Sequence, residues 1–313
     1  MTTTHATSRP DACSMLWADA ELPAWGTASS ARFWVVLEQA GPWGREAALN
    51  SHLDADVGHE LTRACADAGG RLLLVRDPGR HADSTSRSTI SRAWVAGGLA
   101  SRPWLLEGEV EDPIELLRLP WEVLSDEDPD EVGLFLPQLE ETREPLLLVC
   151  TNGRRDVCCA IRGRPAALDA AQRIPGRVLE CSHIGGHRFA PTGIMLPSGQ
   201  TWARLDGDRA ELAYAAERRG EIPAELNDPA YDRGRSCLPP AAQAAQSWVR
   251  QQTGELGLVA LRTADDAGEG LVEVHTHDGS TWRVRVTRVE GPSVRDTCGA
   301  LSKPSITWAA DPA

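Results

Sequence analysis

Residues 150–159 read Cys-Thr-Asn-Gly-Arg-Arg-Asp-Val-Cys-Cys, and residues 180–189 read Glu-Cys-Ser-His-Ile-Gly-Gly-His-Arg-Phe. These two runs contain half of the chain's eight cysteines and two of its eight histidines. Thiolates and imidazoles are the ligands that zinc ions and iron–sulfur clusters use in proteins. A metal centre is therefore expected among the side chains of residues 150–189.

The sequence around these runs alternates between strand and helix patterns. We expect strands at 145–150, 177–181, 192–196 and 201–205 and helices at 165–173 and 208–219, with Cys158 and Cys159 in the loop after the first strand. This order of strand, helix, strand, strand, strand and helix is that of a thioredoxin-like domain. The sequence Ala190-Pro191-Thr192 also resembles the position of the cis-proline in that fold.

An α/β pattern of the same coarse order precedes this domain. Strands are expected at 32–38, 71–76, 92–96 and 103–110, with helices at 53–68 and after Asp112, following an irregular lead-in over 1–30. A charged linker covers 125–131, and a helix at 240–253 with strands at 258–261, 271–275 and 281–286 follows the second domain. The predicted fold class is α/β, with an N-terminal α/β domain at 1–142, a thioredoxin-like domain at 143–235 and a small α+β region at 236–313.

The composition of the 313 residues is that of a soluble globular protein, with 42% hydrophobic and 25% charged residues. No apolar run approaches the ~18 residues of a membrane span, and the N-terminus lacks the apolar run of a secretory signal. We therefore expect a cytoplasmic protein whose cysteines are reduced, metal-bound or inert. A net charge of −13 without basic and aromatic clusters argues against binding to nucleic acid.

The charge is unevenly distributed along the chain. Residues 107–144 contain 14 acidic side chains and two arginines, whereas residues 150–189 contain seven arginines and three acidic side chains. The first stretch is expected to be a solvated linker. The second is ordinary surface, a docking face for an acidic redox partner, or positive charge that offsets an anionic cluster.

His183 and His187 flank two glycines, each of which costs a helix ~1 kcal/mol relative to alanine. The glycines instead permit a tight loop in which both imidazoles turn toward one point. Among Cys150, Cys158 and Cys159, at most two need be ligands, and one of the adjacent pair can face the core as a small apolar side chain. The remaining cysteines are scattered and are expected to be structural, namely Cys13, Cys65, Cys237 and Cys298.

The two motifs together resemble the sucrase/ferredoxin-like family, as do Gly26–Ala28 and Leu37–Gly44 in the N-terminal half. The resemblance implies a thioredoxin-like ferredoxin domain that holds a [2Fe–2S] cluster. In the bis-histidinyl members, the ligands are two cysteines nine positions apart and the two histidines of the Gly-Gly loop. The corresponding residues here are Cys150, Cys159, His183 and His187. Ala160 stands where the family often has glycine, and Cys158 is the rival for Cys159.

These features predict an electron carrier rather than an enzyme, with an unidentified redox protein as its partner. Two neutral imidazoles in place of two thiolates should raise the reduction potential of the cluster. A structural zinc site is the first alternative, because the same Cys2His2 set binds zinc. A thiol–disulfide oxidoreductase is the second, and the lack of a Cys-x-x-Cys motif counts against it. Sucrase activity is disfavoured, because no paired carboxylates occur in a glycosidase context.

Overall fold

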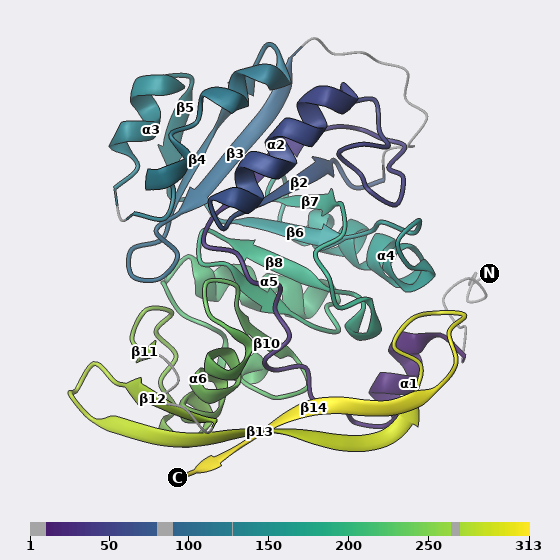
Figure 1. Ribbon diagram of the computed structural model, residues 1–313, viewed down its shortest axis with the longest axis vertical. Coiled ribbons are helices and arrows are strands. Elements are labelled where there is room, and N and C mark those ends of the chain that lie inside the picture. The colour runs from purple at the N-terminus through teal and green to yellow at the C-terminus, as the bar shows by residue number, and fades with distance from the viewer. Residues whose placement is uncertain (1–10, 80–89, 127, 264–269) are drawn as a thin grey trace.

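A computed structural model describes residues 11–79, 90–126, 128–263 and 270–313 of the chain (Figure 1). Within these residues, ten strands form one mixed sheet in the order β10-β9-β8-β6-β7-β2-β1-β3-β4-β5. The α/β class is therefore confirmed. The strands are β1 (Trp34–Glu38), β2 (Arg71–Arg76), β3 (Ser91–Gly97), β4 (Trp104–Val110), β5 (Leu139–Thr142), β6 (Leu146–Cys150), β7 (Val178–Cys181), β8 (Gly193–Leu196), β9 (Gln200–Trp202) and β10 (Asp232–Arg235).

The two halves of this sheet repeat one pairing pattern. In the first half, β1 pairs with β2 in parallel and with β3 in antiparallel fashion, and β3 pairs with β4. In the second half, β6, β7, β8 and β9 pair in the same way. The halves join where β2 meets β7 in antiparallel register, with Arg76 opposite Glu180. The thioredoxin-like assignment and the division into three domains stay predictions.

Helices cover both faces of the sheet (Figure 1). Helix α2 packs Leu61 and Cys65 against alternate residues of β1, and a second core on the opposite face of that strand holds Cys150, Cys159 and Cys181. That second core draws side chains from both halves of the sheet. The helices and 3-10 turns are α1 (Cys13–Asp19), α2 (Ala55–Asp67), η1 (Pro113–Arg118), η2 (Trp121–Val123), α3 (Asp130–Phe135), α4 (Val157–Arg173), η3 (His187–Phe189), α5 (Gly207–Glu217), η4 (Ala224–Leu226) and α6 (Pro240–Thr253).

Helix α4 corrects the prediction for the segment after β6. It begins at Val157 instead of Pro165, so Cys158 and Cys159 lie in its first turn and not in a loop. The reason is the side chain of Asp156, which caps the helix by accepting a hydrogen bond of 2.9 Å from the Cys158 N–H. This first turn brings Cys159 back toward the end of β6.

Three other expectations need correction. Residues 258–261 form a turn instead of a strand, the lead-in contains α1, and the charged linker runs into α3, which buries Val132 in the core. The C-terminal region is a four-stranded antiparallel sheet. Its strands are β11 (Arg262–Thr263), β12 (Leu271–His275), β13 (Thr281–Val294) and β14 (Lys303–Pro312). In Figure 1 the long β13–β14 hairpin, in yellow, lies beside α1. Among the residues described, no helix combines the length and apolar character that crossing a membrane requires.

Candidate metal centre

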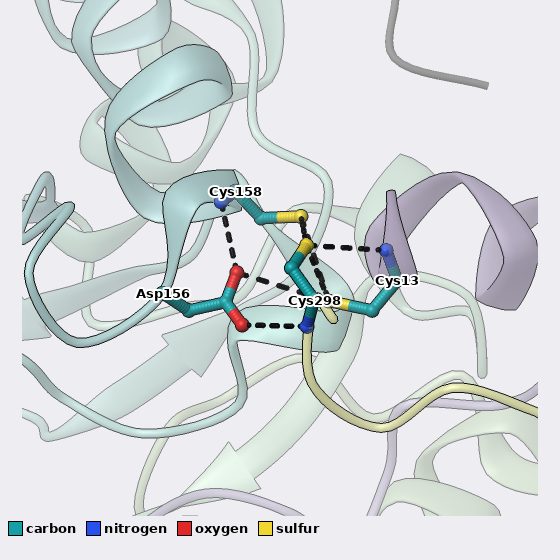
Figure 2. Close-up of side chains that lie close together, drawn as sticks. All are labelled: Cys13, Asp156, Cys158 and Cys298. Carbon is teal, nitrogen blue, oxygen red and sulfur yellow. Dashed lines mark hydrogen bonds between the residues drawn. The ribbon is translucent and has the colours of Figure 1, made fainter. Parts of the chain in front are cut away.

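Two groups of side chains in the described part of the chain bring several metal-ligating atoms within 4.8 Å of one another. The groups are adjacent, because neighbouring cysteines of α4 belong to different ones. The first group is Cys150, Cys159 and His183, and the second is Cys13, Asp156, Cys158 and Cys298 (Figure 2).

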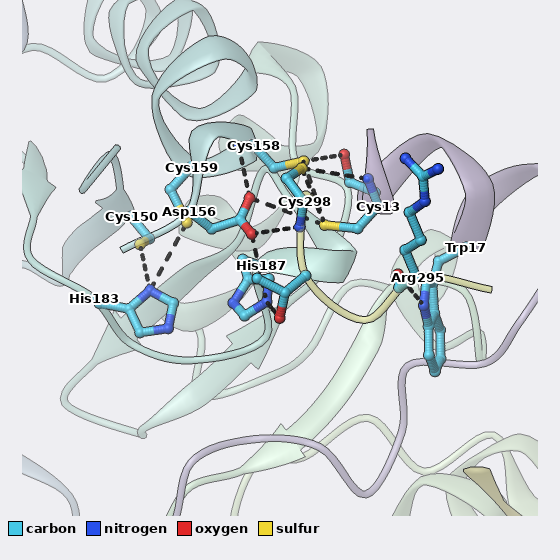
Figure 3. Close-up of polar contacts among 12 residues, drawn as sticks. Cys13, Trp17, Cys150, Asp156, Cys158, Cys159, His183, His187, Arg295 and Cys298 are labelled. Carbon is cyan, nitrogen blue, oxygen red and sulfur yellow. Dashed lines mark hydrogen bonds and ion pairs between the residues drawn. The ribbon is translucent and has the colours of Figure 1, made fainter. Parts of the chain in front are cut away.

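The first group forms where β6, α4 and the loop after β7 converge (Figure 3). Cys150 is the last residue of β6 and Cys159 lies in the first turn of α4, and both are buried. His183 follows β7 by two positions and points its Nδ1 atom at both sulfurs. That nitrogen is 3.6 Å from Cys150 Sγ and 3.8 Å from Cys159 Sγ. The structure thus brings three of the four predicted ligands together.

His187 lies beside the first group but outside the 4.8 Å limit. Its ring centroid is 5.5 Å from that of His183. Its Nδ1 atom is buried and has no hydrogen-bond partner among the described residues. Its Nε2 atom lies 3.1 Å from Thr297 Oγ1 and 3.7 Å from Asp156 Oδ2. The ring nitrogen of His187 that has no partner is thus Nδ1, the equivalent of the nitrogen that His183 directs at the sulfurs.

The two glycines between the histidines form the expected loop. Gly185 and Gly186 have φ angles of 85° and 72°, in the region that residues with a side chain rarely adopt. A Cβ atom at Gly186 would also lie 2.3 Å from Nη2 of Arg233. Glycine at 186 therefore lets the loop pass directly over a buried guanidinium group.

Arg233, in β10, is a residue of this site that the sequence did not reveal. It is fully buried and donates hydrogen bonds to Thr27 Oγ1 at 3.1 Å and to the Gly185 carbonyl at 3.2 Å. Burial lowers the pKa of Arg233 to about 9, and the thiols of Cys150 and Cys159 oppose that shift. Arg233 thus places a buried positive charge near both sulfurs and holds the histidine loop. The one sequence signal was an unusually charged strand, Asp232–Arg235.

The protonation of the first group suits metal binding. The Cys159 thiol donates a hydrogen bond to Cys150, which lowers the pKa of Cys150 well below its usual value, and His183 lowers it further. The same hydrogen bond raises the pKa of Cys159. Burial lowers the pKa of His187 and so favours its neutral form. Thiolate and neutral imidazole are the forms that bind metal, so metal entry would displace the proton that Cys159 retains.

Cys158 points away from the first group. Its sulfur is 3.5 Å from Cys13 Sγ and 3.2 Å from Cys298 Sγ. Of the two adjacent cysteines, Cys159 is therefore the one that lies within reach of Cys150. Cys13 and Cys298, which are far apart in the sequence, thus lie together with Cys158 in space.

A surface cavity of about 260 Å³ reaches His183. Three arginines also line it, namely Arg45, Arg71 and Arg155. Arg154 is exposed nearby in the sequence, whereas Arg188 stacks on the rings of Trp17 and Phe189. His183 thus borders a surface cavity whose lining carries three arginines and one acidic side chain, Glu46.

Comparison with protein families gives one match. The family described as Sucrase/ferredoxin-like matches residues 24–213, a range that runs from before β1 into α5 and includes Cys150, Cys159, His183 and His187. No curated protein and no solved structure matches the chain.

Proposed function

Because the chain belongs to the sucrase/ferredoxin-like family, we propose that it is a one-electron carrier that holds a [2Fe–2S] cluster on Cys150, Cys159, His183 and His187. The observation that carries this proposal is the convergence of two buried thiols on Nδ1 of His183, with the unpaired Nδ1 of His187 beside them. When bound, the cluster would supply reversible exchange of one electron.

The spread of the donor atoms favours a cluster over a single ion at this position. A structural zinc site needs four donors around one ion, at ligand-to-ligand distances of about 3.5–3.8 Å. The three donors of the first group approach one another in this way, whereas His187, the fourth proposed ligand, lies farther out. A binuclear cluster distributes its ligands over two irons and so accepts a wider set.

The surrounding residues of this chain hold the ligands and set their electrostatic environment. Ser29 donates a hydrogen bond of 2.7 Å to the Ile184 carbonyl, and Arg233 donates to the next carbonyl, that of Gly185. These bonds fix the loop between the two histidines. The buried charge of Arg233 stabilises electron density added nearby, so we expect it to raise the reduction potential.

The route for electrons in this proposal leads through the exposed side of His183. The cavity there is lined by Arg45, Arg71 and Arg155, which would attract an acidic redox protein. A docked partner would reach the imidazole edge without entering the buried thiol core. A cytoplasmic location, where such carriers meet reductases, is part of the same proposal.

The test is the optical spectrum and composition of the anaerobically purified chain. We expect a reddish protein that bleaches on reduction and contains about two irons and two acid-labile sulfides per chain. His183→Ala should lose this colour, whereas His59→Ala, a control on the exposed face of α2, should keep it. A colourless protein with zinc at Cys150 and Cys159 would favour the zinc alternative. A Cys150–Cys159 disulfide that exchanges with thiols would favour the oxidoreductase.

A further inference from the structure

The second group of potential ligands gathers three cysteines from distant parts of the chain (Figure 2). Cys13 begins α1, Cys158 lies in the first turn of α4, and Cys298 lies in the connection between β13 and β14. Their sulfurs are 3.2 Å, 3.5 Å and 3.6 Å apart, although Cys13 and Cys298 are separated by 285 positions. Three thiols therefore form a compact triangle in which Cys13 and Cys158 are buried and Cys298 is half-buried.

Asp156 adds an oxygen donor to this triangle. The Cys13 sulfur is 3.9 Å from Asp156 Oδ1, and all four donor atoms of the group lie within 4.8 Å of one another. The carboxylate is already held in place, because its two oxygens accept hydrogen bonds of 2.9 Å from the N–H groups of Cys158 and Cys298. Each oxygen retains a lone pair for a further interaction.

We propose that Cys13, Asp156, Cys158 and Cys298 bind a zinc ion, at a site separate from the first group. A zinc–sulfur bond of ~2.3 Å in a tetrahedral site sets sulfur–sulfur distances of about 3.8 Å. The observed distances of 3.2–3.6 Å are shorter than this by about 0.2–0.6 Å, so a central ion requires only a small outward movement. Unlike the first group, this group supplies all four donors at the spacing of a single ion.

The chemistry of the group favours a metal over a disulfide. A disulfide would use two of the three sulfurs and leave the third thiol facing the Asp156 carboxylate, whereas zinc uses all four donors and offsets their negative charge. Two donors also point at the sulfurs, as expected around bound thiolates. Ser14 Oγ is 3.3 Å from Cys158 Sγ, and the Cys13 N–H is 3.5 Å from Cys298 Sγ.

Zinc at this position would join α1, α4 and the β13–β14 connection next to the first group. Thr297, the neighbour of Cys298, lies within hydrogen-bond distance of His187, and Asp156 lies 3.7 Å from the same imidazole (Figure 3). The ion would therefore hold in place Asp156 and Thr297, which lie next to the His187 imidazole. This inference goes beyond the proposed electron transfer and does not depend on it.

The test is metal analysis of the full-length chain, purified anaerobically from cells grown with added zinc and freed of loose metal by gel filtration. We expect about one zinc per chain. Cys298→Ser and Cys13→Ser should each lose the zinc and keep the iron. His183→Ala should lose the iron and keep the zinc. The matched control Cys65→Ser removes a buried thiol of α2 and should keep both metals.

Four outcomes would overturn this inference. They are the absence of zinc from the wild type, zinc that persists in both cysteine variants, loss of zinc from His183→Ala, and loss of both metals together from the cysteine variants. A Cys158–Cys298 disulfide found by peptide mapping of the zinc-free wild type would explain the first of these. Zinc without iron in the wild type would instead refute the proposed cluster and leave the zinc site standing.

Discussion

The buried ion pair between Arg76 and Glu180 joins the two halves of the large sheet beside the first ligand group. Both side chains are 3% exposed, and the guanidinium donates to Glu180 Oε2 at 2.9 Å and 2.7 Å. Thr151, the residue after Cys150, donates to the same oxygen at 2.9 Å. Replacing Arg76 with methionine keeps the apolar stem but leaves the carboxylate buried without its cation.

The expected loss of stability for Arg76→Met is about 3–5 kcal/mol, the typical cost of removing one partner from a buried pair. The double variant Arg76→Met/Glu180→Leu should recover most of this loss, because it leaves no uncompensated charge. It should still cost about 1 kcal/mol for the hydrogen bond of Thr151. Arg63→Met is the matched control, since Arg63 pairs with Glu60 and Asp67 on the surface of α2 and should change stability little.

Urea unfolding of the four proteins, followed by tryptophan fluorescence, measures these differences. We expect a large shift of the midpoint for Arg76→Met alone. A midpoint for Arg76→Met equal to that of Arg63→Met would contradict this expectation. So would a double variant that is no more stable than the single one, because the cost would then not come from the unpaired carboxylate.

Three further predictions concern stability, ligand choice and docking. Burial raises the pKa of Glu217 from 4.5 to about 7, so the native chain keeps a proton that the unfolded chain releases, and stability falls as pH rises through this window. Glu217→Gln should remove that loss, worth about 3 kcal/mol at about pH 8, and an unchanged pH dependence of the unfolding midpoint would contradict this. Cys159→Ser should lose the iron and Cys158→Ser should retain it. Iron retained in Cys159→Ser and lost from Cys158→Ser would show that Cys158 is the ligand instead. Arg154→Glu and Arg155→Glu should slow electron transfer to an acidic protein and weaken its dependence on salt, whereas rates that ignore both changes would argue against a basic docking face.

The sequence predicted the elements that local patterns determine. The apolar run of β2 and the helix from Pro240 to Thr253 occur with the predicted bounds, because each carries its own periodicity and end signals. The Gly-Gly loop was predictable because two glycines disfavour a helix. The four ligand candidates came from two motifs that are close together in the sequence, and the structure brings three of them into one group.

The remaining features depend on contacts between distant segments. Pro165 suggested a helix start, but the side-chain cap of Asp156 places the start earlier. The meeting of Cys13 and Cys298 with Cys158 has no local signal, because it requires α1 and the β13–β14 hairpin to pack against α4. Arg233 was overlooked for the same reason.

In the proposed function, two cysteines and two histidines hold a [2Fe–2S] cluster. This ligand set is best probed by pulsed electron paramagnetic resonance of the reduced protein, grown with nitrogen-15-labelled histidine. We expect a paramagnetic signal with hyperfine coupling to histidine nitrogens, from which His187→Cys removes one contribution while His183 retains the other. A reduced protein with no paramagnetic signal, or a signal without coupling to histidine nitrogen, would contradict it.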